Sequence, residues 1–393
     1  MNYHQQLEDL LNESESAILN RTEASFDIWA DKIAKGGLFL FGGGVFGRKV
    51  LKGLKRAGIE VLGFADNNKN AWGTEIEGIK VFSPEEAALN HPQAVFMVTM
   101  WSDNNGHPID TIREQLNSYR ATEVISFFHL FWKYPALYMP YFSIDQPIKT
   151  LREKQNILNC FSLFQDEASQ KEFVAQIKWR LQGDYAGLGA PSHFTQYFPD
   201  DLFELGETDV FVDCGAFDGD TLKNFLKKQG NQFAKYYAFE PDPINFEKLN
   251  AFAQSQQEEI SSKIETGNYA ISDERKIIRF NSNGTLQSTS SEDGNIEVQC
   301  IAIDQDLKDV HVTYLKMDVE GAEPDILKGA EQMIKRDHPI IAISVYHEFN
   351  HLWFLPMMVK NYSNEYSFFL RPHCKASWDL LCYCVPKNRL KKQ

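Results

Sequence analysis

Residues 209–222 read DVFVDCGAFDGDTL, in which an apolar run leads into a turn with two glycines and then into the start of a helix. Gly215 and Gly219 can adopt a positive φ and carry no Cβ, so a ligand can approach the bare backbone. The helix N-terminus that follows offers free amide groups to the same ligand. This stretch predicts the first strand, loop and helix of a Rossmann-like α/β domain.

The next strand candidate, YYAFEPD, ends in Glu240, which follows Gly215 by 25 positions (240 minus 215). A carboxylate there can accept hydrogen bonds from both hydroxyls of a ribose. The loop pattern D-x-G-x-x-x-G lacks the three close glycines that a dinucleotide pyrophosphate needs. Asp213 and Asp218 would repel phosphates but suit the ammonium and sulfonium charges of S-adenosylmethionine. We therefore predict that this cofactor contacts Asp213, Gly215, Asp218, Gly219, Glu240 and Asn268.

Two later strand candidates bring acidic and basic groups to the same edge of the sheet. TYLKMDVEGAEPDILKGAEQM places Asp318 and Glu320 at a strand end, and PIIAISVYHE delivers His347. One carboxylate can take the proton of an acceptor hydroxyl while the other holds the acceptor, and a histidine that titrates near neutrality suits proton removal. The alternatives are that the carboxylates cap the following helix, that His347 is structural, or that the three residues bind a divalent cation. Our prediction is catalysis by these three residues without a metal.

Four blocks in this order carry a family resemblance: VDCGAFDGDT, AFEPD, YAIS and LKMDVEGAEPDILKGA. They resemble the FkbM family of methyltransferases over about residues 209–386. The resemblance implies a seven-stranded Rossmann-like sheet with helices on both faces, S-adenosylmethionine as methyl donor, and O-methylation, often of sugars or glycan-linked hydroxyls. By motif, it implies that Asp213, Gly215 and Glu240 bind the donor and that Asp318 and Glu320 line the acceptor site. Cys214 departs from the small or aliphatic residue of many members, at a position expected to face the core.

A second glycine motif lies near the N-terminus, where Gly42-x-Gly44-x-x-Gly47 follows a strand candidate and opens a helix. Asp66 follows Gly47 by 19 positions (66 minus 47), at the end of the next strand candidate. This spacing is typical of a nucleotide-binding Rossmann unit. With the later segment GTEIEGIKVFSPEE, it looks like the small domains attached to sugar-modifying enzymes of surface-glycan pathways, which can bind a nucleotide-sugar. NAD binding, or a relic that only packs or dimerises, are the alternatives.

At 393 residues the chain exceeds one ordinary core, and strands alternate with helices in both halves. We predict an α/β protein with two Rossmann-like domains. Between the third and fourth strands of the second domain, a predicted hairpin carries a polar tip, Leu286 to Ser291, which either touches the acceptor or is solvated. The predicted organisation is a helical segment at 1–35 that serves as a cap or homo-oligomer contact, a nucleotide-binding-like domain at 36–142, a helical linker or lid at 143–208, and a methyltransferase domain at 209–393.

Composition limits the partners. A formal net charge of −14 with dispersed basic residues opposes the phosphate backbone, so we expect no nucleic acid. Six scattered cysteines and a polar, acidic N-terminus indicate reduced thiols, no secretion signal and a cytoplasmic location. The most apolar stretch, at 125–142, is interrupted by histidine, lysine and two prolines and predicts no membrane span.

Together these patterns predict an S-adenosylmethionine-dependent O-methyltransferase whose acceptor is a small molecule or a glycan precursor, with nucleotide-linked sugars among the options. One alternative is an NAD-dependent sugar oxidoreductase in which the first domain carries the chemistry. Another is a nucleotide-sugar-binding assembly protein whose methyltransferase half is inactive. The fold alone does not distinguish these three functions, so the residues of the site have to distinguish them.

Overall fold

The computed structural model describes residues 2–101, 108–121, 123–185, 187–282, 284, 289–290, 294–374 and 377–391. The chain divides into two compact units, which are described separately. Unit 1 comprises Met1–Lys154, Val174–Ala190 and Cys374–Trp378, and unit 2 comprises Gln155–Phe173, Pro191–His373 and Asp379–Gln393. The predicted linker or lid at 143–208 is thus shared between the units. Among the described residues, every helix is too short or too polar to span a bilayer.

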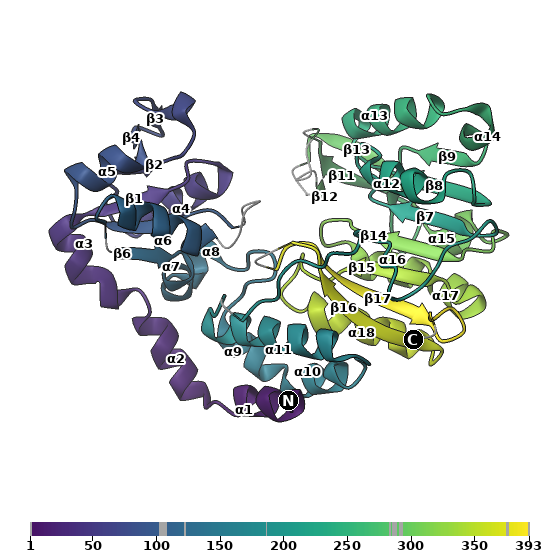
Figure 1. Ribbon diagram of the computed structural model, residues 1–393, viewed down its shortest axis with the longest axis horizontal. Coiled ribbons are helices and arrows are strands. Elements are labelled where there is room, and N and C mark those ends of the chain that lie inside the picture. Colours follow the sequence, from purple (N-terminus) through teal and green to yellow (C-terminus); the bar gives the residue numbers. More distant parts are fainter. Residues whose placement is uncertain are drawn as a thin grey trace. The chain divides into compact units, whose positions relative to one another are not determined.

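Unit 1 contains a six-stranded sheet in the order β3-β4-β2-β1-β5-β6, in which only β3 and β4 pair antiparallel (Figure 1). Along β1, Leu38 and Leu40 belong to one apolar cluster, whereas Phe39 and Phe41 belong to another. Both faces of the sheet are therefore buried, as expected for parallel strands. The strands are β1 (Leu38–Phe41), β2 (Gly63–Ala65), β3 (Glu75–Ile76), β4 (Ile79–Phe82), β5 (Val95–Val98) and β6 (Glu123–Ser126).

Helices of unit 1 precede, connect and follow these strands, and two short 3-10 turns complete the unit. Helix α5 begins at Pro84, because Ser83 accepts a hydrogen bond from the Glu86 amide and proline suits the first helical position. The helices are α1 (Tyr3–Leu11), α2 (Glu15–Ala24), α3 (Ala30–Gly36), α4 (Val45–Arg56), α5 (Pro84–Asn90), α6 (Pro108–Ser118), α7 (Phe128–Lys133), α8 (Pro135–Tyr138) and α9 (Pro147–Arg152), with η1 (Asp27–Trp29) and η2 (Lys69–Ala71); α11 (Glu167–Gln182) is divided between the units.

Unit 2 contains the seven-stranded sheet that the family resemblance implied, and this expectation is confirmed. Its order is β16-β17-β15-β14-β7-β8-β9, and β17 runs antiparallel to both of its neighbours. The five strands from β15 to β9 in this order are parallel, so their carboxyl ends meet at one edge of the sheet. The strands are β7 (Val210–Cys214), β8 (Lys235–Phe239), β9 (Ile264–Gly267), β14 (Tyr314–Met317), β15 (Ile340–Ser344), β16 (Tyr366–Pro372) and β17 (Leu380–Pro386).

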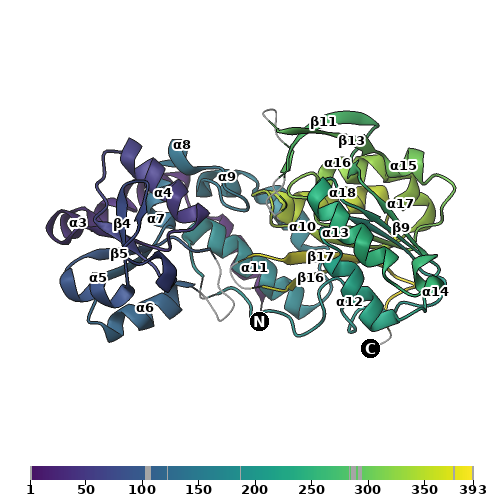
Figure 2. The ribbon, with the colours of Figure 1, turned by 90° about the horizontal axis from the view of Figure 1, so that it is seen from above.

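Helices cover both faces of this sheet, with α12, α13 and α14 on one side and α16, α17 and α18 on the other (Figure 2). Helix α13 starts after Glu240 because Asp242 accepts hydrogen bonds from the amides of Ile244 and Asn245 and is followed by a proline. The helices are α10 (Lys154–Phe161), α12 (Asp220–Gln229), α13 (Pro243–Gln254), α14 (Glu258–Ser261), α15 (Ile303–Asp306), α16 (Glu323–Gly329), α17 (Glu331–Asp337) and α18 (His351–Tyr362).

The predicted hairpin between the third and fourth strands is part of a separate sheet in the order β10-β13-β11-β12. Strands β11 and β13 pair antiparallel, while β10 and β13 pair parallel. The predicted tip, Leu286 to Ser291, lies outside the described residues except for the backbone of Thr289 and Ser290. The strands are β10 (Ala270–Ile271), β11 (Lys276–Asn281), β12 (Thr289–Ser290) and β13 (Ile296–Ile301).

Candidate active site at the carboxyl ends of the central strands

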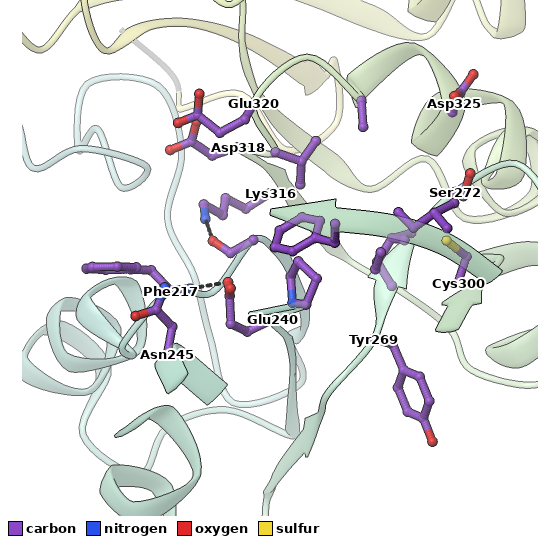
Figure 3. Close-up of a pocket in the computed structure, with 18 of the residues that line it drawn as sticks. Phe217, Glu240, Asn245, Tyr269, Ser272, Cys300, Lys316, Asp318, Glu320 and Asp325 are labelled. Carbon is purple, nitrogen blue, oxygen red and sulfur yellow. Dashed lines mark hydrogen bonds between the residues drawn. The ribbon is translucent and has the colours of Figure 1, made fainter. Parts of the chain in front are cut away.

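A pocket of about 230 Å³ lies at the carboxyl ends of β7, β8 and β14, with the sheet of β10, β11 and β13 as a further wall (Figure 3). Figure 3 shows Asp318 and Glu320 at one end of the pocket, Glu240 and Phe217 below them, and Ser272 and Cys300 on the far side. The predicted residues that line this pocket are Gly215, Glu240, Asp318 and Glu320.

Gly215 is the position where β7 comes closest to the residue that follows β14. Its φ is +82°, and a Cβ placed on it would lie 2.1 Å from the backbone oxygen of Asp318. Only glycine fits there, because a side chain would need both a left-handed backbone and space that a carbonyl already fills. Gly215 also lines the pocket, and the approach of a ligand to its bare backbone stays a prediction.

Asp213 and Lys316 form a buried ion pair at the pocket floor, and Lys316 is the partner that lines the pocket. They are register partners on β7 and β14, their Oδ1 and Nζ atoms are 2.9 Å apart, and the Tyr236 hydroxyl donates to Asp213 at 2.7 Å. Burial lowers the pKa of Lys316, but the carboxylate outweighs burial and places that pKa above its ordinary value. Lys316 also donates to the Gly215 carbonyl at 2.5 Å. Asp213 thus fixes the loop from below and does not line the pocket.

Glu240 is held by the loops on either side of it. Its two oxygens accept hydrogen bonds from the Phe217 amide at 2.9 Å and the Asp242 amide at 3.0 Å. Burial raises the pKa of Glu240 to about 7, and these two hydrogen bonds oppose the rise. Since each carboxylate oxygen has a second lone pair, the group can still accept hydrogen bonds from a ligand in the pocket.

The other residues that were predicted to contact the methyl donor lie around the pocket but do not line it. Asn268 donates to the backbone oxygens of Glu240 and Pro241, at 2.8 and 3.1 Å, and so shapes the loop. Asp218 pairs with Lys223 at 3.2 Å, and Gly219, at φ +87°, precedes the first residue of α12. Their positions make them supports of the loop rather than part of the pocket wall.

Asp318 has both carboxylate oxygens engaged. Oδ2 accepts a hydrogen bond from the Tyr197 hydroxyl at 2.7 Å, and Oδ1 accepts one from the Ser344 hydroxyl at 2.8 Å. Burial favours the neutral acid, but Lys316, His347 and these hydroxyls outweigh it and hold the pKa of Asp318 below its usual value. The residue is therefore a fixed anion at the pocket wall.

Glu320 differs from Asp318 although it lies only two positions away. Its backbone is left-handed, with φ +54°, and Gly321 follows at φ +106°. Burial raises the pKa of Glu320 to about 7; His347 opposes this rise and the Asp318 carboxylate adds to it. Within the described part of the chain, no protein group donates a hydrogen bond to its carboxylate, which is one-quarter exposed. Glu320 can thus gain or lose a proton near neutral pH at the pocket wall.

His347 lies behind these two carboxylates and does not line the pocket. Its side chain is 1% exposed, and its Nδ1 atom is 2.6 Å from Oε1 of Glu323. Burial lowers the pKa of His347, but Glu323, Asp318 and Glu320 raise it to about 10. The sequence suggested a histidine that titrates near neutrality, whereas this environment keeps the ring protonated at neutral pH, because several buried carboxylates surround it.

Sequence reasoning missed three side chains of this end of the site. Tyr197 lines the pocket and comes from a segment before the predicted domain, so no local pattern identified it. Ser344 is an ordinary residue at the end of a buried strand. Glu323 is part of the DVEGAE motif, and its spacing of five from Asp318 was the available signal.

In unit 1 the glycines of the N-terminal motif have distinct roles. Gly42 has φ +107°, and a Cβ on Gly47 would lie 2.0 Å from the Gly42 oxygen, whereas a Cβ on Gly44 would meet nothing within 4 Å. Asp66 accepts a hydrogen bond from the Gly43 amide at 2.8 Å. Gly42 thus makes a tight turn, Gly44 leaves open backbone and Gly47 makes a close packing contact, while nucleotide binding by this loop stays a prediction.

Unit 2 is therefore a Rossmann-like α/β domain. Its pocket lies at the carboxyl ends of its parallel strands and is bordered by acidic side chains. Residues 213–370 match the family model for the methyltransferase FkbM domain, so this segment carries a methyltransferase domain of that type. The match covers less than half of the chain.

A crystal structure of methyltransferase FkbM from Methylobacillus flagellatus KT has the same fold. It matches with a TM-score of 0.73 and 21% identity, over 95% of this chain and 100% of that chain. A putative rRNA-methylase from Clostridium thermocellum aligns with a TM-score of 0.29 and 10% identity, over 47% of this chain and 88% of that chain, too low to carry an argument. No curated protein matches the sequence significantly.

Proposed function

We propose that this chain is an S-adenosylmethionine-dependent O-methyltransferase that acts on a hydroxyl of a sugar or glycan precursor. The observation that carries the proposal is one pocket that is lined mainly by the segment that matches a methyltransferase model. Glu240 lies in it at the position expected for a carboxylate that accepts hydrogen bonds from a ribose. Asp318 and Glu320 add two carboxylates whose pKa values differ. The sugar acceptor rests on the family resemblance of the motifs.

The residues present fit the methyl donor. Gly215 keeps the pocket floor free of a side chain, and Glu240 has lone pairs for ribose hydroxyls. When bound, S-adenosylmethionine supplies an electrophilic methyl group on a positively charged sulfur. The acidic pocket lining, which includes Asp220 and Asp318, favours such a cation.

Glu320 is the proposed general base. A base works best when its pKa is close to the working pH, and the pKa of Glu320 lies at about 7. Asp318 is a weaker base because its pKa is lowered and both its oxygens are engaged. We assign Asp318 to holding the acceptor hydroxyl and Glu320 to taking its proton.

Replacing Glu240 by alanine is expected to raise the Kd for S-adenosylmethionine. Hydrogen bonds to a charged group contribute about 1.5–3 kcal/mol, which corresponds to roughly 10- to 150-fold in affinity. Because the pKa of Glu240 is about 7, the wild-type affinity should improve as the pH rises through that value. Isothermal titration calorimetry between pH 5.5 and 8.5 measures both effects. Glu265→Gln, an exposed change on neighbouring β9, is the control, and an unchanged Kd in the Glu240 variant would remove it from the donor site.

The reaction itself is tested by mass spectrometry of candidate glycan intermediates incubated with isotope-labelled S-adenosylmethionine. A gain of one labelled methyl group is expected on one hydroxyl. Absence of S-adenosylmethionine binding, together with energy transfer from the protein to added NADH, would favour the sugar oxidoreductase instead.

We also propose that unit 1 binds a nucleotide-sugar at Gly42, Gly44, Gly47 and Asp66. The open backbone at Gly44 supports this. Gly44→Ala is expected to lower the affinity for UDP-glucose roughly tenfold or more, since close backbone approach is what this glycine permits, while Tm stays unchanged because the Cβ meets nothing within 4 Å. Calorimetry and a thermal scan test this. If the wild-type protein binds neither UDP-glucose nor NAD, the proposal is wrong and the glycine loop of unit 1 has only a packing role.

A further inference from the structure

Acidic side chains surround His347, which lies in the segment that follows β15. Its Nε2 atom is 3.4 Å from Oδ1 of Asp318 and 3.9 Å from Oε2 of Glu320, while Nδ1 is 2.6 Å from Glu323 at the start of α16. Asp318 and Glu320 follow β14, so two different segments place carboxylates on the two sides of one ring. The ring and Glu323 are almost completely buried.

A metal ion is one way to hold such a cluster, because Asp318, Glu323 and His347 bring ligand-type atoms within 4.8 Å of one another. The contact between His347 and Glu323 excludes its two atoms as joint ligands. Two ligands at about 2.1 Å from one ion stand about 3 Å apart or more, whereas Nδ1 of His347 and Oε1 of Glu323 are 2.6 Å apart. That separation is typical of a charge-assisted hydrogen bond. An ion on the opposite ring nitrogen is an outcome of the test below.

We propose that His347 is a permanently protonated positioning residue, held by Glu323, which keeps Asp318 and Glu320 in the charge states and positions that the reaction needs. The assignment rests on the proposed function only for the roles of those two carboxylates. His347 itself does not reach the pocket and takes no proton from the acceptor.

The balance of charge supports this proposal. Glu323 is fully buried and would be strongly destabilised as an isolated anion, so it needs a cationic partner. Its other oxygen faces a second histidine, His351, at 3.4 Å, too far and poorly aligned for a hydrogen bond. Burial lowers the pKa of His351 to about 4, whereas that of His347 is about 10, so His347 supplies the positive charge.

The same pair also fixes the backbone that carries Glu320. Oε1 of Glu323 accepts a hydrogen bond from the Val319 amide at 3.1 Å in addition to its contact with His347. The next residue is Glu320 with its left-handed φ, a conformation that persists only when neighbouring contacts enforce it. Asp379 and Tyr346 complete the titratable surroundings. Tyr346 donates a hydrogen bond to Asp379 at 3.4 Å, and burial raises the pKa of Asp379 while the His347 ring opposes that rise.

Nuclear magnetic resonance of the full-length protein with ¹⁵N-labelled histidine tests the charge state directly. Between pH 5.5 and 9, the two ring nitrogens of His347 are expected to keep imidazolium shifts, while His351 stays neutral; His347→Gln and His351→Gln assign the signals. A His347 ring that is neutral at pH 7, or whose signals move on addition of Mg²⁺ or Zn²⁺, would overturn the proposal. This readout does not depend on methyl transfer, so it separates failure of this proposal from failure of the proposed function.

Kinetics test the effect on the carboxylates. His347→Gln keeps a hydrogen-bond donor for Glu323 but removes the charge, so the rising limb of kcat against pH is expected to move upward by on the order of one unit, with the Kd for S-adenosylmethionine unchanged. His351→Gln is the matched control and should not move that limb. A His347→Gln enzyme with a lower kcat but an unmoved pH limb would indicate a merely structural role and overturn the proposal.

Discussion

Replacement of Glu320 by glutamine is expected to lower kcat for methyl transfer by about 10²- to 10⁴-fold, the range that general acid-base catalysis contributes. Glutamine has nearly the same size and lacks the basic oxygen. The left-handed backbone at this position and the glycine after it can stay as they are, so the loss should come from chemistry. Steady-state rates with labelled donor measure the effect, and calorimetry should give an unchanged Kd for the donor.

The pH profile sharpens this test. Glu320 acts as a base only when deprotonated, so wild-type kcat should be high above about pH 7 and fall as the pH drops below the pKa of about 7. In the glutamine variant this limb should disappear from the residual rate. Glu331→Gln on α17, whose carboxylate pairs with Lys335, is a control that should leave rate and profile unchanged. If the Glu320 variant kept the wild-type rate, the proton would have to go to another group.

Gly215→Ala should abolish binding of the methyl donor and destabilise unit 2. A left-handed φ costs a non-glycine residue roughly 1–2 kcal/mol, and overpacking typically adds roughly 1–3 kcal/mol. Here the methyl group would lie 2.1 Å from the Asp318 carbonyl, which is backbone, so β7 and β14 would have to separate. Thermal scans and calorimetry with S-adenosylmethionine measure both losses.

Gly206→Ala is the matched control for this substitution. It lies in unit 2, and its Cβ would meet nothing within 4 Å. Its Tm and donor affinity should match those of the wild type. Should Gly215→Ala bind the donor as tightly as the control does, the pocket floor would not be where the donor lies.

Local sequence patterns predicted strands such as β14, β15, β16 and β17 of unit 2 well, because each is an apolar run that is almost completely buried. The pairing order was harder to predict. β17 lies between β15 and β16 although it is the last strand in the chain, and only contacts between distant segments decide that. The predicted segment at 143–208 read as one linker because helical periodicity does not tell which core a helix joins.

The candidate site was predictable where a residue type and a strand end coincide, as at Glu240, Asp318 and Glu320. It was not predictable where burial decides the chemistry. In the sequence, Asp213 looks like an acid that faces a ligand. In the structure it pairs with Lys316 on the adjacent strand and does not line the pocket. His347 looks like a base that titrates near neutrality, whereas Glu323, Asp318 and Glu320, all from the segment after β14, raise its pKa.

The division of the chain has a practical consequence for anyone who expresses fragments. The backbone changes units after Lys154, Phe173, Ala190, His373 and Trp378, so neither unit is one continuous piece of sequence. A fragment cut to the matched span, 213–370, would lose all of β17 and leave β15 and β16 without the strand between them. It would also lack Tyr197, a partner of Asp318. The smallest fragment worth purifying therefore extends well beyond the span that matches the family model.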